Sequence, residues 1–161
     1  PFVRLSSNST FRALLGGWQI AGIVTLQTGI PVTPTISPNP ANTTGPARPD
    51  RIRDGNLPSG QRSLGRWFDP TAFARPANFN FGNSGRHIIR APGLSTLDGL
   101  ISRNFRFSET RQLEFRSELY NLSNSAQFGR PALDVATAQA GQITSTSVIN
   151  RQVQFGLRLV F

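Results

Sequence analysis

Apolar and polar residues alternate one by one in four stretches of the chain, which is the period expected of β-strands with two unlike faces. The stretches cover residues 17–27, 94–107, 112–122 and 151–161. In the last of them Val153, Phe155, Leu157, Leu159 and Phe161 alternate with Gln152, Gln154, Gly156 and Arg158. No helical periodicity of comparable length competes with these stretches. The sequence therefore predicts an all-β fold of antiparallel strands.

The connections between these strands differ greatly in length. Only residues 108–111 separate the second strand from the third, whereas residues 28–93 and 123–150 form long connections. Ten of the twelve prolines fall within residues 28–93. Loops of this length are uncommon in compact soluble domains. Short turns at one end and long loops at the other are typical of β-barrels of the bacterial outer membrane.

Strand length also favours a transmembrane barrel over a soluble β-sandwich. The last strand has 11 residues and spans roughly 36 Å at about 3.3 Å per residue. Tilted by about 45°, it rises roughly 26 Å, close to the apolar band of about 25 Å on such barrels. Sandwich strands are typically about five or six residues long. A soluble extracellular β-sandwich that serves as a binding or adhesion module is the alternative.

The two faces of the strands can be assigned on the barrel interpretation. Polar residues opposite the apolar face would point into the lumen, and these are Asp98, Arg106, Glu114, Arg116 and Glu118. Aromatic residues gather toward the short-turn end, as the girdle at a lipid–water boundary requires, and these are Trp18, Phe105, Phe107 and Phe161. A turn centred on Thr110 would place Phe107 opposite Leu113, Phe105 opposite Phe115 and Arg106 opposite Glu114.

Alternating strand direction fixes the predicted topology. The chain would supply the last four to five antiparallel strands of one barrel domain, with short periplasmic turns. The loops at about residues 28–93 and 123–150 would then be extracellular. Residues 1–5 would be the end of a fifth, preceding strand, and residues 6–16 would form a periplasmic turn.

Composition and charge exclude several functions. Cysteine, methionine and lysine are absent, and all 17 basic residues are arginine, which gives a net charge of +9. The arginines are scattered among loops and strands without a basic run, so we expect no nucleic-acid partner. His87 is the only histidine, and neither a metal site nor a nucleophile–base pair can be assembled around it. The sequence predicts no catalytic residues, no metal, no cofactor and no enzyme activity.

Several motifs, in order along the chain, resemble one known family. They are GGWQIAG at residues 16–22, QTGIP at 27–31, WFDPTAF at 67–73, FGNSGR at 81–86, RAPG at 90–93, and YNL with QFG at 120–122 and 127–129. Together they resemble the C-terminal part of TonB-dependent outer-membrane receptors, in the branch with a carboxypeptidase-regulatory-like N-terminal domain. The likeness covers nearly the whole chain.

The resemblance implies a location, a function and partners. Such receptors lie in the bacterial cell outer membrane and import a bulky nutrient actively. Their barrels have 22 strands, and their plug domain and TonB-contacting segment lie outside the residues present here. The implied partners are outer-membrane lipid, TonB through that missing N-terminal region, and an unknown small or oligomeric ligand. The substrate class stays open among siderophores, oligosaccharides and peptides.

Two sets of residues are candidates for specific roles in such a receptor. A C-terminal strand ending in an aromatic residue resembles the signal that the barrel-assembly machinery reads, which implicates Phe155, Leu157, Leu159 and Phe161. Aromatic and arginine residues of the long loop are candidates for ligand contact, and these are Arg66, Trp67, Phe68, Phe73, Arg86 and His87. Packing of Trp67 and Phe73 onto the barrel rim is the alternative role for these two rings.

Overall fold

A computed structural model describes residues 16–161 of the chain. The predicted fifth strand at residues 1–5 lies outside the described residues, as does almost all of the predicted turn at 6–16. The described chain divides into two compact units. We call the first, residues 16–25, 96–125 and 149–161, the strand unit, and the second, Leu26–Ser95 with Ala126–Val148, the loop unit.

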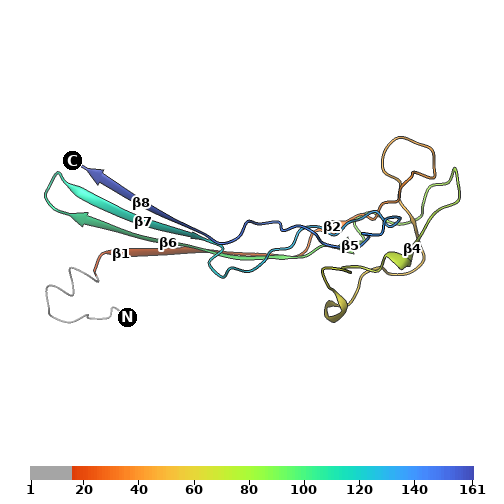
Figure 1. Ribbon diagram of the computed structural model, residues 1–161, viewed down its shortest axis with the longest axis horizontal. Helices are drawn as coiled ribbons and strands as arrows, with labels where there is room; N and C mark the ends of the chain where they lie inside the picture. Colours follow the sequence, from red (N-terminus) through yellow and green to blue (C-terminus); the bar gives the residue numbers. More distant parts are fainter. Residues whose placement is uncertain (1–15) are drawn as a thin grey trace. The chain divides into compact units, whose positions relative to one another are not determined.

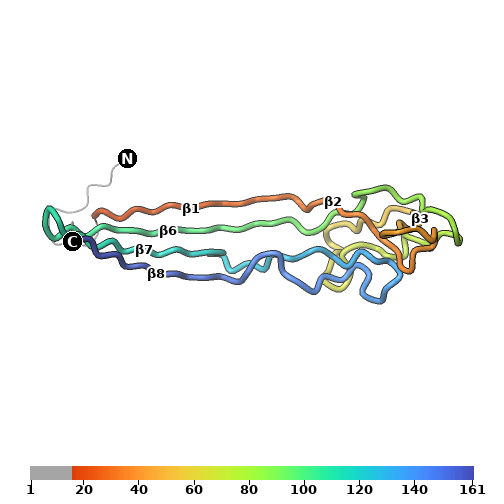
Figure 2. The backbone as a smooth tube through the Cα atoms, turned by 90° about the horizontal axis from the view of Figure 1, so that it is seen from above, coloured from red at the N-terminus to blue at the C-terminus, as the bar shows by residue number. Residues whose placement is uncertain are grey.

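Four long strands form one sheet in the order β1-β6-β7-β8 (Figures 1 and 2). Their bounds are Trp18–Gln27 for β1, Leu94–Arg106 for β6, Gln112–Tyr120 for β7 and Gln152–Val160 for β8. The β6–β7 and β7–β8 pairs are antiparallel. The prediction of an all-β, antiparallel fold is confirmed. Among the described residues, no helix is long and apolar enough to cross a membrane.

One face of this sheet is apolar and exposed. On β8, Phe155 is 69% exposed and Leu157 is 72% exposed, and on β1 Ile20 is 78% exposed. Within the described chain no second sheet covers these side chains. A soluble sandwich would bury such a face between two sheets, whereas a membrane strand presents it to lipid.

An arginine lies on this apolar face near the short turn. Arg103 pairs directly with Phe115 across β6 and β7. Its guanidinium lies 4.4 Å from the ring centroid of Phe105 and 5.3 Å from that of Trp18, and the residue is only 9% exposed. Cation–π contact with these two rings allows a positive charge on a face that otherwise excludes charge.

The predicted register of the β6–β7 hairpin is wrong by two residues. Phe105 lies opposite Leu113 instead of Phe115, and Arg106 lies opposite Gln112 instead of Glu114. The amides of Phe107 and Ser108 both donate to the carbonyl of Arg111, so the turn is tighter than predicted.

The Ser108 side chain explains this tighter turn. Its hydroxyl accepts a hydrogen bond from the Arg111 amide at 3.1 Å, which closes the turn locally. A shift of two residues preserves the face of every side chain. The five polar residues assigned to the lumen therefore still share one face of the sheet.

The long connections form a unit with its own hydrophobic core. The core consists of Val32, Phe68, Ala72, Phe73, Ile89 and Ala91. Two small antiparallel sheets frame it, one of β2 (Pro31–Val32) with β5 (Ile89–Arg90) and one of β3 (Asp50–Arg51) with β4 (Phe73–Ala74). Two 3-10 helices, η1 (Ser59–Gln61) and η2 (Pro70–Ala72), complete the unit. Strands of two residues are too short for alternation to reveal them.

The two faces of β8 should respond differently to an added charge. We expect Leu157→Arg to destabilise the intact protein in lipid bilayers by about 2–4 kcal/mol, the cost of an arginine on the lipid face near mid-membrane. Gln154→Arg is the control, because Gln154 lies opposite Glu118 on the polar face. Urea unfolding in lipid vesicles measures both changes. Equal destabilisation by the two variants would contradict the assignment of faces.

Candidate functional site

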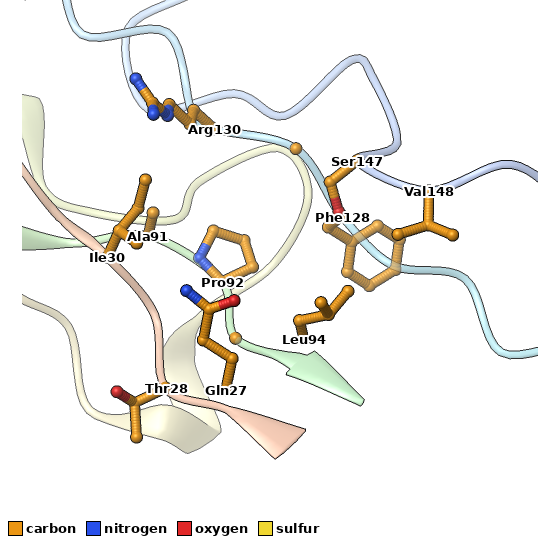
Figure 3. A pocket seen from close by; sticks show the side chains of 12 residues that line it. Gln27, Thr28, Ile30, Ala91, Pro92, Leu94, Phe128, Arg130, Ser147 and Val148 are labelled. Carbon is orange, nitrogen blue, oxygen red and sulfur yellow. The ribbon is translucent and has the colours of Figure 1, made fainter. Parts of the chain in front are cut away.

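A cavity of about 260 Å³ lies in the loop unit, where the chain leaves β1 and enters β6 (Figure 3). We call it the junction pocket. Four segments line it, at residues 27–30, 91–94, 128–130 and 147–148. Figure 3 shows the side chains of Leu94, Phe128 and Val148 near one another at one side of the view, with the Pro92 ring between them and Ile30. The pocket is therefore largely apolar.

Glycines allow these segments to approach backbone to backbone. A Cβ atom on Gly29 would lie 1.7 Å from the carbonyl oxygen of Ala91, and one on Gly93 would lie 2.7 Å from that of Gln27. Neither contact is possible for a residue with a side chain. The glycines of the QTGIP and RAPG motifs are thus required by the packing of the pocket's walls.

A buried glutamine joins two of the segments. Gln127 is 6% exposed, and its side-chain carbonyl accepts from the Ser95 amide at 2.8 Å. Its amide group donates to the Ser95 carbonyl at 2.6 Å. The side chain thus satisfies both backbone groups of Ser95, as a neighbouring strand would. This explains the glutamine of the QFG motif.

Four polar or charged residues also line the pocket, and these are Gln27, Thr28, Ser147 and Arg130. Arg130 is exposed, and among the described residues its guanidinium makes no hydrogen bond or ion pair. In Figure 3 its side chain extends away from Phe128. A largely apolar lining with a few hydrogen-bonding groups is typical of small-molecule sites.

Asp69 organises a second part of the loop unit, the WFDPTAF segment. Its carboxylate accepts from the Arg53 and Arg66 guanidiniums, each at 2.8 Å. It also accepts from the Thr71 hydroxyl at 2.8 Å and the Thr71 amide at 3.2 Å, and so caps η2. Burial alone would raise the pKa of Asp69. The hydrogen bonds from Thr71 and the two guanidiniums outweigh it and hold the pKa well below its ordinary value of 3.8.

The structure separates the residues predicted to contact a ligand. Phe68 is completely buried and Phe73 is 7% exposed, and their rings pack edge to face in the core. The Trp67 indole donates to the Arg90 carbonyl at 2.7 Å, and the Arg62 guanidinium lies 5.6 Å from the ring centroid. Within the described unit, this leaves the exposed Arg66, Arg86 and His87, with half-buried Trp67, as the residues with surface for a ligand.

None of the six predicted ligand-contact residues lines the junction pocket. Those six residues were selected because aromatic and arginine side chains often contact ligands. About half of the pocket's lining comes from residues beside the end of β1 and the start of β6, and its one aromatic residue, Phe128, and its one arginine, Arg130, lie in the other long connection. The glycines of QTGIP, RAPG and QFG are the signal that could have indicated it.

The polar face of the strand unit carries the other predicted residues. Arg116 and Glu118 form an ion pair, with Nε and Oε1 2.7 Å apart. The Tyr120 hydroxyl donates to Glu118 at 2.7 Å, and Asp98 accepts from the Asn121 amide at 2.8 Å. Arg116, Glu118 and Tyr120 are thus linked in one row, which is suited to contact with water in a lumen. Among residues 16–161, no group of three or more acidic or histidine side chains is arranged to hold a metal ion.

Comparison with known proteins gives one match. A family model described as "Outer membrane beta barrel domain" matches residues 1–154. No curated protein matches the chain, and no solved structure does.

Removing the Asp69 charge should loosen the loop unit. We expect Asp69→Asn to cost about 2–3 kcal/mol, since charge-assisted hydrogen bonds of a largely buried carboxylate are lost. Because the pKa of Asp69 is lowered on folding, this stabilisation is complete above pH about 4 and is lost progressively as pH falls from there through the lower pKa of the folded state. Limited proteolysis of the intact protein at pH 7 should accelerate at least tenfold within the loop unit.

The control for this variant is Asp54→Asn. Asp54 is exposed and pairs with Arg51 at 3.2 Å, so its substitution should cost less than about 1 kcal/mol. Equal rates of proteolysis in the wild type and in Asp69→Asn would show that the carboxylate does not hold the loop unit together.

Proposed function

The chain belongs to the family of outer membrane beta barrel domains, and we propose that it is part of a TonB-dependent receptor that imports a bulky nutrient. The protein is located in the bacterial outer membrane. In this proposal the sheet is part of the barrel wall, and the loop unit is the extracellular part that first meets the nutrient. The polar face of the sheet lines the transport path.

The folding of the long connections into a compact loop unit is the main support for this proposal. Residues Leu26–Ser95 and Ala126–Val148 form a unit with a core, two small sheets and a pocket. A wall that only separates two compartments requires no such folded connection. Ordering a long loop costs backbone entropy. A pre-formed binding surface for a ligand is a function that would explain why the loop is nevertheless ordered.

The proposed partners follow from the two faces and the last strand. Outer-membrane lipid covers the apolar face. The barrel-assembly machinery contacts β8 through Phe155, Leu157, Leu159 and Phe161, of which Phe161 is 92% exposed. TonB acts through a region outside this chain. No enzyme activity, cofactor or nucleic-acid partner belongs to the proposal.

Coupling to TonB can be tested without knowing the nutrient. After cross-linking in living cells, the intact protein should carry TonB in an amount comparable to that of an established receptor in the same membrane. Purified in a planar bilayer, it should show no steady conductance, because a receptor of this kind is plugged. Absence of the cross-link together with a stable open conductance would instead establish a passive pore.

A further inference from the structure

Two phenylalanine side chains of the loop unit are exposed although their backbone is held firmly. Phe79 is 77% exposed and Phe81 is 76% exposed. The folding of the loop unit does not by itself explain why two phenylalanine rings are exposed to water.

The backbone of Phe79 is in an unfavourable conformation. Its φ angle is +65°, a region in which a bulky residue is rare. The Phe79 amide donates to the Pro40 carbonyl at 2.7 Å, which holds this conformation. Backbone strain kept by the surrounding structure is found most often at functional sites.

The backbone beside Phe81 is held equally firmly. A Cβ atom on Gly82 would lie 2.0 Å from the Arg48 carbonyl oxygen, so the two segments are in direct contact. The Asn83 amide donates to the Asp50 carboxylate at 2.9 Å, and the Ser84 amide donates to the Pro49 carbonyl at 3.1 Å. The backbone that follows Phe81 is therefore held in place.

A second cavity of the loop unit, distinct from the junction pocket, lies beside this ring. Its volume is about 210 Å³, and its walls include Phe81, Arg48, Thr43 and Thr44. This volume is below the roughly 300–1,000 Å³ of sites for drug-sized ligands, so the cavity suits a single ring.

The polar groups of this cavity indicate the chemistry of its occupant. One Arg48 nitrogen donates to the Ser84 carbonyl at 2.7 Å, which orients the guanidinium and leaves its other N–H groups available. In the described part of the chain, the Thr44 hydroxyl makes no hydrogen bond. None of the described residues that line the cavity is acidic.

We propose that Phe81, Arg48 and Thr44 form a binding site for an anionic saccharide. The C–H face of a sugar ring would stack on the Phe81 ring, and its hydroxyls would bond to Thr44. Its carboxylate or phosphate would pair with the Arg48 guanidinium. Phe79 does not line the cavity, and its exposed ring would offer a second stacking surface for another sugar of the same chain. This site requires no coupling to TonB, so it stands apart from the proposed import function.

Two sources could supply such a saccharide, and titration calorimetry of the intact protein in detergent distinguishes them. The probes are trigalacturonate, as a free acidic oligosaccharide, and the delipidated saccharide of the host lipopolysaccharide. Maltotriose is the neutral control. We expect at least one acidic probe to bind tenfold or more tightly than maltotriose, with affinity that falls as salt rises. Absence of binding by both acidic probes, or equal binding of maltotriose, would overturn the proposal.

Substitution of the ring tests the site itself. Phe81→Ala should weaken binding of the acidic probe at least tenfold without changing the melting temperature. Phe107→Ala is the matched control, because Phe107 is 68% exposed in the hairpin turn of the strand unit. If Phe81 instead packs against another part of the intact protein, Phe81→Ala will lower the melting temperature and leave binding unchanged, which would overturn the proposal.

Discussion

The peptide groups of a chain that crosses lipid must all find hydrogen-bond partners within the protein, because the bilayer offers none. This requirement explains the long, regular strands of the sheet. β6 and β7 pair without interruption from Gly99–Leu119 to Arg106–Gln112, and β7 pairs with β8 over its full length. Once such strands lie in a membrane, the period of two directs one set of side chains to lipid and the other to water. Arg103 is the exception on the lipid side, and it is covered by aromatic rings.

The loop unit obeys a different constraint. Its connections are long, so it must compensate for lost backbone entropy with its own core and polar contacts. Phe68 and Phe73 supply the core, and Asp69 lies between them in sequence and binds two arginines. The WFDPTAF segment therefore stabilises the folded loop unit, through two buried rings and the carboxylate that lies between them in sequence. The glycines at 29 and 93 then bring the chain ends of β1 and β6 together around the junction pocket.

Much of the strand unit could be predicted from sequence because period-two alternation is a local signal. The strand ranges and the faces of Glu114, Arg116 and Glu118 follow from it directly. The hairpin register does not, because it depends on the Ser108 hydroxyl closing the turn two residues earlier than expected. The requirement that apolar residues of both strands share one face is met equally by registers that differ by two residues, so it cannot distinguish them.

The loop unit could not be predicted in the same way. Its contacts join residues far apart in sequence, such as Gln127 with Ser95 and Asn83 with Asp50. No local pattern encodes such pairs. The resemblance included the WFDPTAF and QFG motifs without assigning their residues a role. The ligand-contact prediction selected aromatic and arginine residues of the long loop, and so it included Phe68, which the structure places in the core. Phe79 and Phe81 alternate with Asn78 and Asn80, but this alternation is too short to predict a strand, and it does not show that both rings are exposed.

The assignment of the two sheet faces to lipid and water is the claim on which the account depends. The chain contains no cysteine, so single cysteines can be introduced along β8 from Gln152 to Val160 and spin-labelled in the intact protein in bilayers. Relaxation by oxygen and by a water-soluble nickel complex then reports the surroundings of each position. The account predicts strict alternation, with Val153, Phe155, Leu157 and Leu159 accessible to oxygen and Gln154, Gly156 and Arg158 accessible to nickel. Uniform accessibility to nickel along β8 would contradict a membrane-spanning strand.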